Sequence, residues 1–179
     1  MELTDTAYLI LGALAERPRS GYDIKRFADM ATRHFWAVSY GQLYPELRRL
    51  SDAGLVEAEP GGPRHRTVWR ITPAGREALE EWVDDPADHP LELRDGMLVR
   101  LFFSDVAGPA TRLELARRLA ARHRAMRDRL QDKCRQLAAA PREAPMHQEV
   151  LRLGVDLNDF MAGWYEDLAE RLAGKEDTR

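Results

Sequence analysis

The stretch Ser39–Leu55, SYGQLYPELRRLSDAGL, decides the fold because it is the clearest amphipathic helix in the chain. Leu43, Leu47 and Leu50 recur at positions i, i+4 and i+7, so they share one face of a helix. Gly54 lies four residues after Leu50 and predicts a left-handed cap at the helix end. The pattern therefore predicts a helix with one buried leucine face and one polar face.

Two starts are open for this helix. Ser39 and Gln42 have the spacing of a capping box. That start would place Pro45 at the sixth helical position, where its ring clashes with the carbonyl group four residues earlier. A start at Gly41 would place Pro45 in the first turn at a lower cost. The proline therefore favours the start at Gly41.

Other elements are predicted on both sides of this helix. Ser20 and Thr72 have the character of N-caps, and Pro73 suits a first helical position. The turn cluster Pro60-Gly61-Gly62-Pro63 separates two strand patterns and predicts a β-hairpin. The elements expected around the central helix are helices at 4–16, 21–32 and 72–83 and strands at 56–59 and 66–71.

Three helices followed by a β-hairpin is the order of a winged helix-turn-helix. An α-helix fits the major groove of DNA, where Arg and Gln pair with purine edges. The basic hairpin tip would reach a phosphate or the minor groove, and the start of the 21–32 helix could position the DNA backbone. The candidate DNA-contacting residues are Ser20, Tyr22, Lys25, Ser39, Tyr40, Gln42, Tyr44, Arg48, Arg49, Arg64, His65 and Arg66.

The sequence after Asp84-Asp85-Pro86-Ala87-Asp88-His89-Pro90 is predicted to be entirely helical, with helices at about 91–103, 110–139 and 146–173. This segment is the expected boundary between domains 1–85 and 86–179. The last helix carries apolar residues at alternating spacings of three and four over almost four heptads. We expect this stripe to bury itself in a homodimer, with Trp164 as an anchor. The dimer residues predicted on this stripe are Leu153, Leu157, Phe160, Trp164 and Leu168.

Composition excludes several classes of protein. The 179 residues include only eight Val and three Ile, which rules out an all-β fold and favours a mainly helical one. The chain has no stretch of 18 apolar residues and begins without a basic region, so we expect no membrane span, no signal peptide and a cytoplasmic location. One cysteine, Cys134, excludes an internal disulfide. No catalytic or phosphate-binding motif is present, so neither an enzyme nor a cofactor is expected.

The charge distribution is uneven although the net charge is only −3. Residues 1–85 carry 11 Lys and Arg against 14 Asp and Glu. Residues 112–135 carry nine against three, and residues 149–177 carry three against eight. The basic segment could be a second DNA surface, but we favour an ion-paired helix face beside the acidic last helix.

Three blocks of the sequence, LxxLxxxPxSGYDIKRF, FWxxSYGQLYPELRRLxxxGLV and VWRITPAGREAL, closely resemble the PadR family of bacterial transcriptional regulators. The resemblance covers about residues 5–82, and the length of the chain is similar to the subgroup with a long C-terminal domain. It implies a homodimer with a winged-helix domain and a C-terminal helical dimerisation domain, and it does not carry over an effector. The net acidic charge of the first half departs from what strong non-specific DNA binding needs.

The resemblance and the wing favour DNA contact over plainer interpretations of the same residues. Arg48 and Arg49 could be a solvated helix face, Arg64-His65-Arg66 a polar hairpin tip, and Tyr40 and Tyr44 packing residues. The main interpretation is a regulator, expected to be a repressor, that binds a pseudo-palindromic operator as a homodimer. The alternative is a winged-helix scaffold for protein interaction or drug binding without operator specificity, and a third possibility is an architectural DNA binder.

A small aromatic or apolar effector is the predicted release signal. Aromatic residues near the domain junction are the candidate pocket walls, although for His123 we favour a hydrogen-bonded core histidine, with an effector contact as the alternative. The candidate effector residues are Tyr8, Trp36, Tyr40, Trp82, Met97 and His123.

Overall fold

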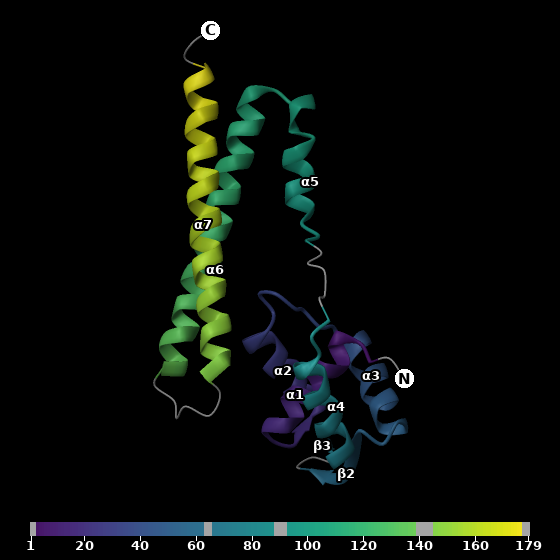
Figure 1. Cartoon of the computed structure of the whole chain (residues 1–179). Helices are drawn as coiled ribbons and strands as arrows, with labels where there is room; N and C mark the ends of the chain where they lie inside the picture. The colour runs from purple at the N-terminus through teal and green to yellow at the C-terminus, as the bar shows by residue number, and fades with distance from the viewer. Residues whose placement is uncertain (1–2, 63–65, 88–92, 139–144, 177–179) are drawn as a thin grey trace. The chain divides into compact units, whose positions relative to one another are not determined.

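The computed structural model describes residues 3–62, 66–87, 93–138 and 145–176. Contacts divide the chain into two compact units, Met1–His89 and Pro90–Arg179. The fold is mainly helical with one small sheet, as the sequence predicts (Figure 1). Each unit has its own apolar core, so each is described separately.

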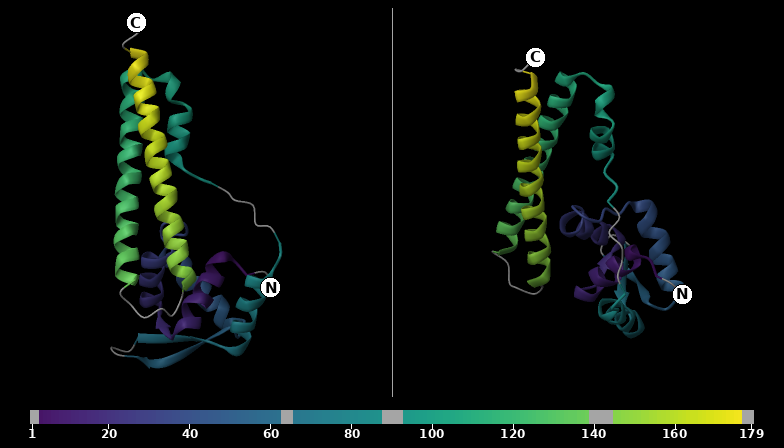
Figure 2. Two further views of the ribbon diagram at one scale, coloured as in Figure 1. Left: turned by 60° about the vertical axis from the view of Figure 1, so that its left-hand side comes forward. Right: turned by 45° about the horizontal axis from the view of Figure 1, so that its top comes forward.

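The described residues of the first unit form four helices and a three-stranded sheet. The helices are α1 (Asp5–Glu16), α2 (Gly21–Ala31), α3 (Tyr40–Asp52) and α4 (Pro73–Asp84). The strands are β1 (Arg19–Ser20), β2 (Val56–Gly62) and β3 (Arg66–Ile71). All pairs are antiparallel in the order β1-β3-β2, and β2 and β3 form the hairpin visible in Figure 2.

The leucine face of α3 builds the core of the first unit. Leu43, Leu47 and Leu50 are completely buried. They pack with apolar residues of α1, α2 and β2, and burial of each such side chain contributes about 1.5–3 kcal/mol to stability. The buried partners on those three elements are Ala7, Ile10, Leu11, Ala13, Leu14, Ile24 and Val56.

The start of α3 corrects the sequence-based prediction. The helix begins at Tyr40 and not at Gly41, with Ser39 as N-cap and Gln42 closing the capping box. Pro45 therefore lies inside the helix. The capping box satisfies two backbone N–H groups at the helix start. Pro45, inside the helix, has no backbone N–H and therefore leaves out one helical hydrogen bond.

Strand β1 is an element that the sequence does not reveal. Arg19 and Ser20 pair with Trp69 and Val68 of β3. The Arg19 side chain is buried: it donates hydrogen bonds to the carbonyl oxygen of Ala13 and to the Glu16 carboxylate. The pairing is non-local and only two residues long, so no alternation of apolar and polar residues marks it.

The second unit is built on two long antiparallel helices, α6 (Pro109–Ala138) and α7 (Pro145–Glu176), which lie side by side in every view (Figures 1 and 2). A shorter helix, α5 (Gly96–Phe102), packs on α6, and a 3-10 turn (Ser104–Val106) follows it. The predicted helix at 91–103 is therefore too long. Asp95 caps α5 by accepting a hydrogen bond from the backbone N–H of Met97 at 2.8 Å, and residues 93–95 precede the helix.

The predicted charge pairing between the last two helices is confirmed. Arg124 of α6 forms an ion pair with Glu166 of α7, and Arg127 pairs with Asp159 at 2.7 Å. The hydrogen bonds that Arg127 donates to Asp159 and Asp128 raise the pKa of Arg127. These pairs support the interpretation of the basic segment as an ion-paired helix face.

Candidate nucleic-acid interface

Four of the predicted DNA-contacting residues lie together where α2, α3 and β3 meet. Ser20, Tyr22, Tyr44 and Arg48 line one pocket of about 400 Å³. Tyr22 and Tyr44 are 49% and 43% exposed, so their rings are accessible on this surface. The pocket thus presents hydroxyl groups, an aromatic surface and a guanidinium group to one ligand. The remaining lining residues, which sequence reasoning missed, are Gly21, Thr67 and Trp69.

Gly21 sets the position of the Tyr44 ring. A Cβ atom at Gly21 would lie 2.7 Å from Cε1 of Tyr44, closer than real Cβ contacts allow. Ser20 starts α2 just before this glycine, because its Oγ accepts a hydrogen bond from the backbone N–H of Asp23 at 3.2 Å. The sequence signal was present in the Ser-Gly-Tyr block, but the contact with α3 is tertiary.

The two predicted contact residues at the start of α3 have a structural role. The backbone N–H of Ser39 donates to Oε1 of Gln42 at 2.9 Å, and the backbone N–H of Gln42 donates to Oγ of Ser39 at 3.3 Å. Both side chains are exposed. They therefore hold the first turn of α3 rather than line the pocket.

Lys25 is committed to contacts within the first unit. Its side chain is only 12% exposed, forms an ion pair with Asp29 and lies 5.6 Å from the centre of the Tyr40 ring. The hydrogen bond from Lys25, helped by Arg33 and opposed by desolvation, lowers the pKa of Asp29. Tyr40 in turn stacks on Tyr44 with ring centres 6.1 Å apart. These contacts tie α2 to the exposed face of α3.

Arg49 also has a partner within the first unit. Its guanidinium group lies 3.1 Å from the carboxylate of Glu46, which accepts a hydrogen bond from Thr4 at 3.0 Å. This contact links α3 to the start of α1. Arg48 and Arg49 therefore have different surroundings, although they are adjacent in sequence.

The predicted wing tip is only partly within the described residues. Arg64 and His65 lie outside them, and Arg66 is described only by its backbone, which pairs with Gly62 at the start of β3. Nearer the base of the hairpin, Arg70 bonds to Glu59 at 2.9 Å. This hydrogen bond lowers the pKa of Glu59 and raises that of Arg70.

The predicted effector residues fall into two groups. In the first unit, Tyr8 and Trp82 stack with ring centres 4.5 Å apart, while Trp36 and Tyr40 are 38% and 46% exposed. In the second unit, Met97 packs on the core cluster that contains Leu119, Ala120 and Tyr165.

His123 belongs to the second group. Its ring stacks on that of Tyr165 with centres 5.5 Å apart, and its Nδ1 lies 2.9 Å from Oδ1 of Asn158. Burial raises the pKa of Tyr165. These contacts are those of a hydrogen-bonded core histidine, which is the interpretation that the sequence favoured.

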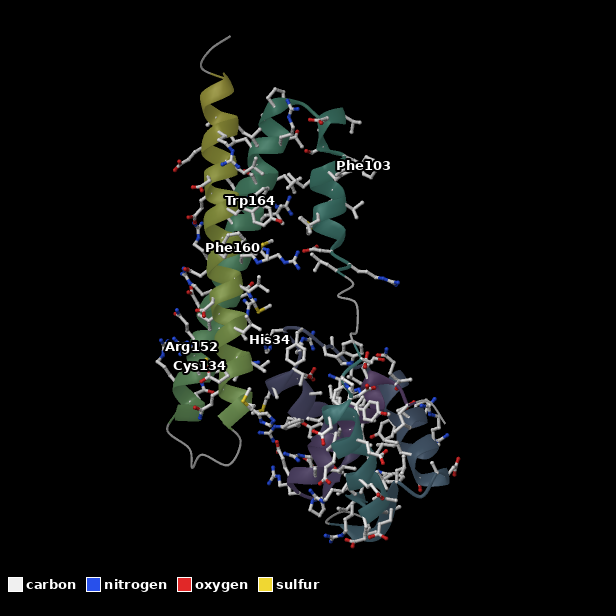
Figure 3. All side chains as sticks on the ribbon, viewed as in Figure 1. His34, Phe103, Cys134, Arg152, Phe160 and Trp164 are labelled. Atoms are coloured by element: carbon white, nitrogen blue, oxygen red, sulfur yellow. The ribbon has the colours of Figure 1, made fainter. Side chains whose placement is uncertain are left out.

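The predicted dimer stripe on α7 does not form the core of the second unit. Leu153, Leu157, Phe160 and Trp164 are 66%, 56%, 66% and 43% exposed, and the last two extend from α7 in Figure 3. Leu168 differs from them because it packs against the core cluster. The exposed α7 face is therefore defined here as Leu153, Leu157, Phe160 and Trp164.

Two absences apply to the described part of the chain. No group of His, Cys, Asp and Glu side chains there has the arrangement of a metal site. No helix there is both long enough and apolar enough to cross a membrane.

The chain combines a winged helix-turn-helix unit, an architecture typical of DNA-binding proteins, with an antiparallel pair of long helices. Residues 10–81 match the "Transcriptional regulator PadR-like family", and residues 93–173 match the "Virulence activator alpha C-term" family. The N-terminal part of the chain is therefore similar to the PadR-like family of transcriptional regulators, and its C-terminal part is similar to that of the subgroup with a long C-terminal domain.

Curated relatives agree with this assignment. The chain is 28% identical over 99 residues to the negative transcriptional regulator PadR of Bacillus subtilis (strain 168), covering 54% of each chain. It is 50% identical over 52 residues to the transcriptional regulator Rv3488 of Mycobacterium tuberculosis, covering 28% of this chain and 49% of the relative. The alignments thus span about half the length of these relatives.

Solved structures show the same fold over nearly the whole chain. The PadR-like regulator BC1756 from Bacillus cereus has a TM-score of 0.82 at 24% identity, covering 96% of this chain and 99% of that one. Bacillus subtilis PadR has a TM-score of 0.80 at 23% identity in complex with operator DNA, and 0.77 at 24% in complex with p-coumaric acid. Both comparisons cover 93% of this chain and 98% of that one.

Proposed function

We propose that this regulator binds a pseudo-palindromic operator as a homodimer, represses transcription, and is released by a small aromatic or apolar effector. One observation carries the DNA-binding part: Ser20, Tyr22, Tyr44 and Arg48 gather in one exposed pocket on the helix-turn-helix. The complex of Bacillus subtilis PadR with operator DNA supports it by analogy. The name of that relative, a negative transcriptional regulator, supports repression.

Arg48 is the residue that we expect to read base sequence. Its guanidinium group can donate two hydrogen bonds to O6 and N7 of guanine, a contact worth about 1–3 kcal/mol of discrimination. Arg64 and Arg66 belong to the wing tip that the sequence predicts, and we expect them to contact phosphates or the minor groove. Removing Arg48 and removing the two wing arginines should therefore affect DNA binding in different ways.

The experiment is a mobility-shift assay in a salt series, using the DNA upstream of the chain's own coding sequence and a random duplex. Arg48→Ala should weaken operator binding by about tenfold to a hundredfold and leave random-DNA binding nearly unchanged. Arg64→Ala combined with Arg66→Ala should weaken both and flatten the salt slope by about two. Arg171→Ala on α7 is a charge-matched control and should change neither.

If the wing variant removes only operator specificity and Arg48→Ala removes only salt dependence, the roles of Arg48 and the wing are exchanged. If neither set of variants has an effect, this surface does not read DNA. That result would favour the scaffold without operator specificity, for which the net acidic charge of residues 1–85 is the supporting observation. Equal affinity of the wild-type chain for the operator and for random DNA would instead favour an architectural binder.

The homodimer proposal rests on the exposed α7 face. Four large apolar side chains lie on one side of one helix, and apolar patches of this kind on soluble proteins mark interaction sites. The effector proposal rests on the aromatic residues of the first unit, the stacked pair of Tyr8 and Trp82 and the exposed Trp36 and Tyr40. The complex of Bacillus subtilis PadR with p-coumaric acid supports it by analogy.

A further inference from the structure

A second and larger groove lies in the first unit, apart from the pocket that contains Arg48. It encloses about 970 Å³ between the start of α1, the end of α3 and the outer part of α4. Tyr8 and Trp82 line it as a stacked pair, with ring centres 4.5 Å apart and planes only 9° from parallel. Both rings are partly exposed, so the groove offers an aromatic surface.

The rim of this groove carries an unusual charge. Its lining includes five carboxylates and neither Lys nor Arg. None of the five carboxylates has an ion pair with another described residue, and Asp85 accepts a hydrogen bond only from the backbone N–H of Ala87, at 2.9 Å. Because like charges repel, such a rim favours the approach of a cation. The five rim carboxylates are Glu77, Glu80, Glu81, Asp84 and Asp85.

Aromatic faces attract cations through their quadrupole, and Trp does so most strongly. An anionic ligand would meet only like charge here, and a neutral ligand would gain no ionic attraction from the rim. The volume falls within the range of about 300–1,000 Å³ that is typical of small-molecule sites. We propose that the Tyr8–Trp82 groove binds a flat organic cation, such as an aromatic ring system that carries a quaternary nitrogen.

The position of the groove connects it to the DNA-binding elements. Ala53 and Leu55, which line it, flank Gly54 in the turn between α3 and β2. The carbonyl oxygen of Leu55 also accepts the backbone N–H of Thr72, which caps α4. A bound cation would therefore contact the turn that joins the recognition helix to the wing. The proposal rests on the proposed effector function and specifies that the effector is a cation.

The test is direct binding to the whole chain in the absence of DNA, with N-methylquinolinium as the cation and quinoline as its neutral analogue. Calorimetry should show binding of N-methylquinolinium at least about fivefold tighter than quinoline, and its affinity should fall as salt is added. Trp82→Leu, which removes the better aromatic face, should weaken the cation about fivefold to tenfold.

Charge variants keep the test independent of folding. Glu77→Gln combined with Glu81→Gln should weaken the binding of N-methylquinolinium and leave the binding of quinoline unchanged. Glu57→Gln on β2, outside the groove, should alter the affinity of neither compound. The proposal is overturned if the cation does not bind, if quinoline binds equally well, or if the groove variants match Glu57→Gln. Operator binding and its dependence on Arg48 are measured separately, so either idea can fail alone.

Discussion

Among the glycines of the first unit whose surroundings the structure describes, Gly75 has the least room for a side chain. A Cβ atom there would lie 2.1 Å from the carbonyl oxygen of Leu55, a backbone atom that cannot rotate away. Gly75→Ala must therefore displace α4 from the turn before β2. We expect the free energy of unfolding to fall by about 1–3 kcal/mol, measured by urea denaturation.

A second glycine provides the control for this prediction. Gly12 lies within α1, and a Cβ atom there would meet nothing within 4 Å. Gly12→Ala should raise stability by about 0.5–1 kcal/mol, because alanine favours the helix more than glycine does. Equal stability of the two variants would contradict the packing argument.

The Lys25–Asp29 pair predicts a pH dependence of stability. Its hydrogen bond lowers the pKa of Asp29 in the folded chain below the usual value of 3.8. A lowered pKa means that the stabilisation is present above pH 3.8 and is lost as the pH falls through the folded-state pKa. Asp29→Asn should therefore reduce the urea midpoint at pH 7, and the difference from wild type should shrink progressively below pH 3.8. A constant difference at all pH values would exclude the ion pair as its cause.

Sequence reasoning found the residue types of the candidate interface but not their neighbours. It selected both Arg48 and Arg49 because both lie on the polar side of one helix. Arg49 pairs with Glu46 on the same helix, at the i,i+3 spacing. The tertiary contacts come from other elements: Arg48 shares a pocket with Trp69, and Glu46 is bonded to Thr4. Helical spacing does not encode such tertiary contacts, so the distinction required the structure.

At the scale of elements, the capping box at Ser39 determines where α3 begins despite Pro45. The Ser39 side chain accepts the backbone N–H of Gln42, so Ser39→Ala removes this bond. We expect a loss of about 0.5–2 kcal/mol in the free energy of unfolding, measured by urea denaturation. Ser51→Ala near the other end of α3 is the matched control and should be close to neutral. Similar losses in both variants would argue against the cap.

The element boundaries that sequence predicted well are those with local signals. Thr72 caps α4 and Gly54 adopts a φ of 73° after α3, as their residue types predict. The face of α7 was harder to predict. Its buried side uses one leucine, one tyrosine and small residues, whereas most of the large apolar residues that dominate the sequence pattern face outward. Hydrophobic spacing alone does not tell which of two faces meets a partner in the same chain. The buried residues of α7 are Leu151, Gly154, Ala162, Tyr165 and Ala169.

At the scale of the whole molecule, the exposed α7 face predicts association between two copies. Trp164 lies near one end of this face and Leu157 near its middle. Trp164→Ala should cost about 2–4 kcal/mol of association, as expected for an aromatic anchor. Because Trp164 also contacts Tyr165, with ring centres 5.1 Å apart, its loss could disturb the second unit as well.

Leu157→Glu separates association from folding. The side chain is 56% exposed in the single chain, so a carboxylate there should remain solvated in the monomer but become buried and unpaired in a dimer. We expect wild type to sediment as a dimer at micromolar concentration and Leu157→Glu as a monomer with unchanged helical circular dichroism. Val83→Ala, at an exposed apolar position in the first unit, should remain dimeric. A wild-type monomer at this concentration would contradict the proposal. A dimeric Leu157→Glu chain would instead place the interface on another surface.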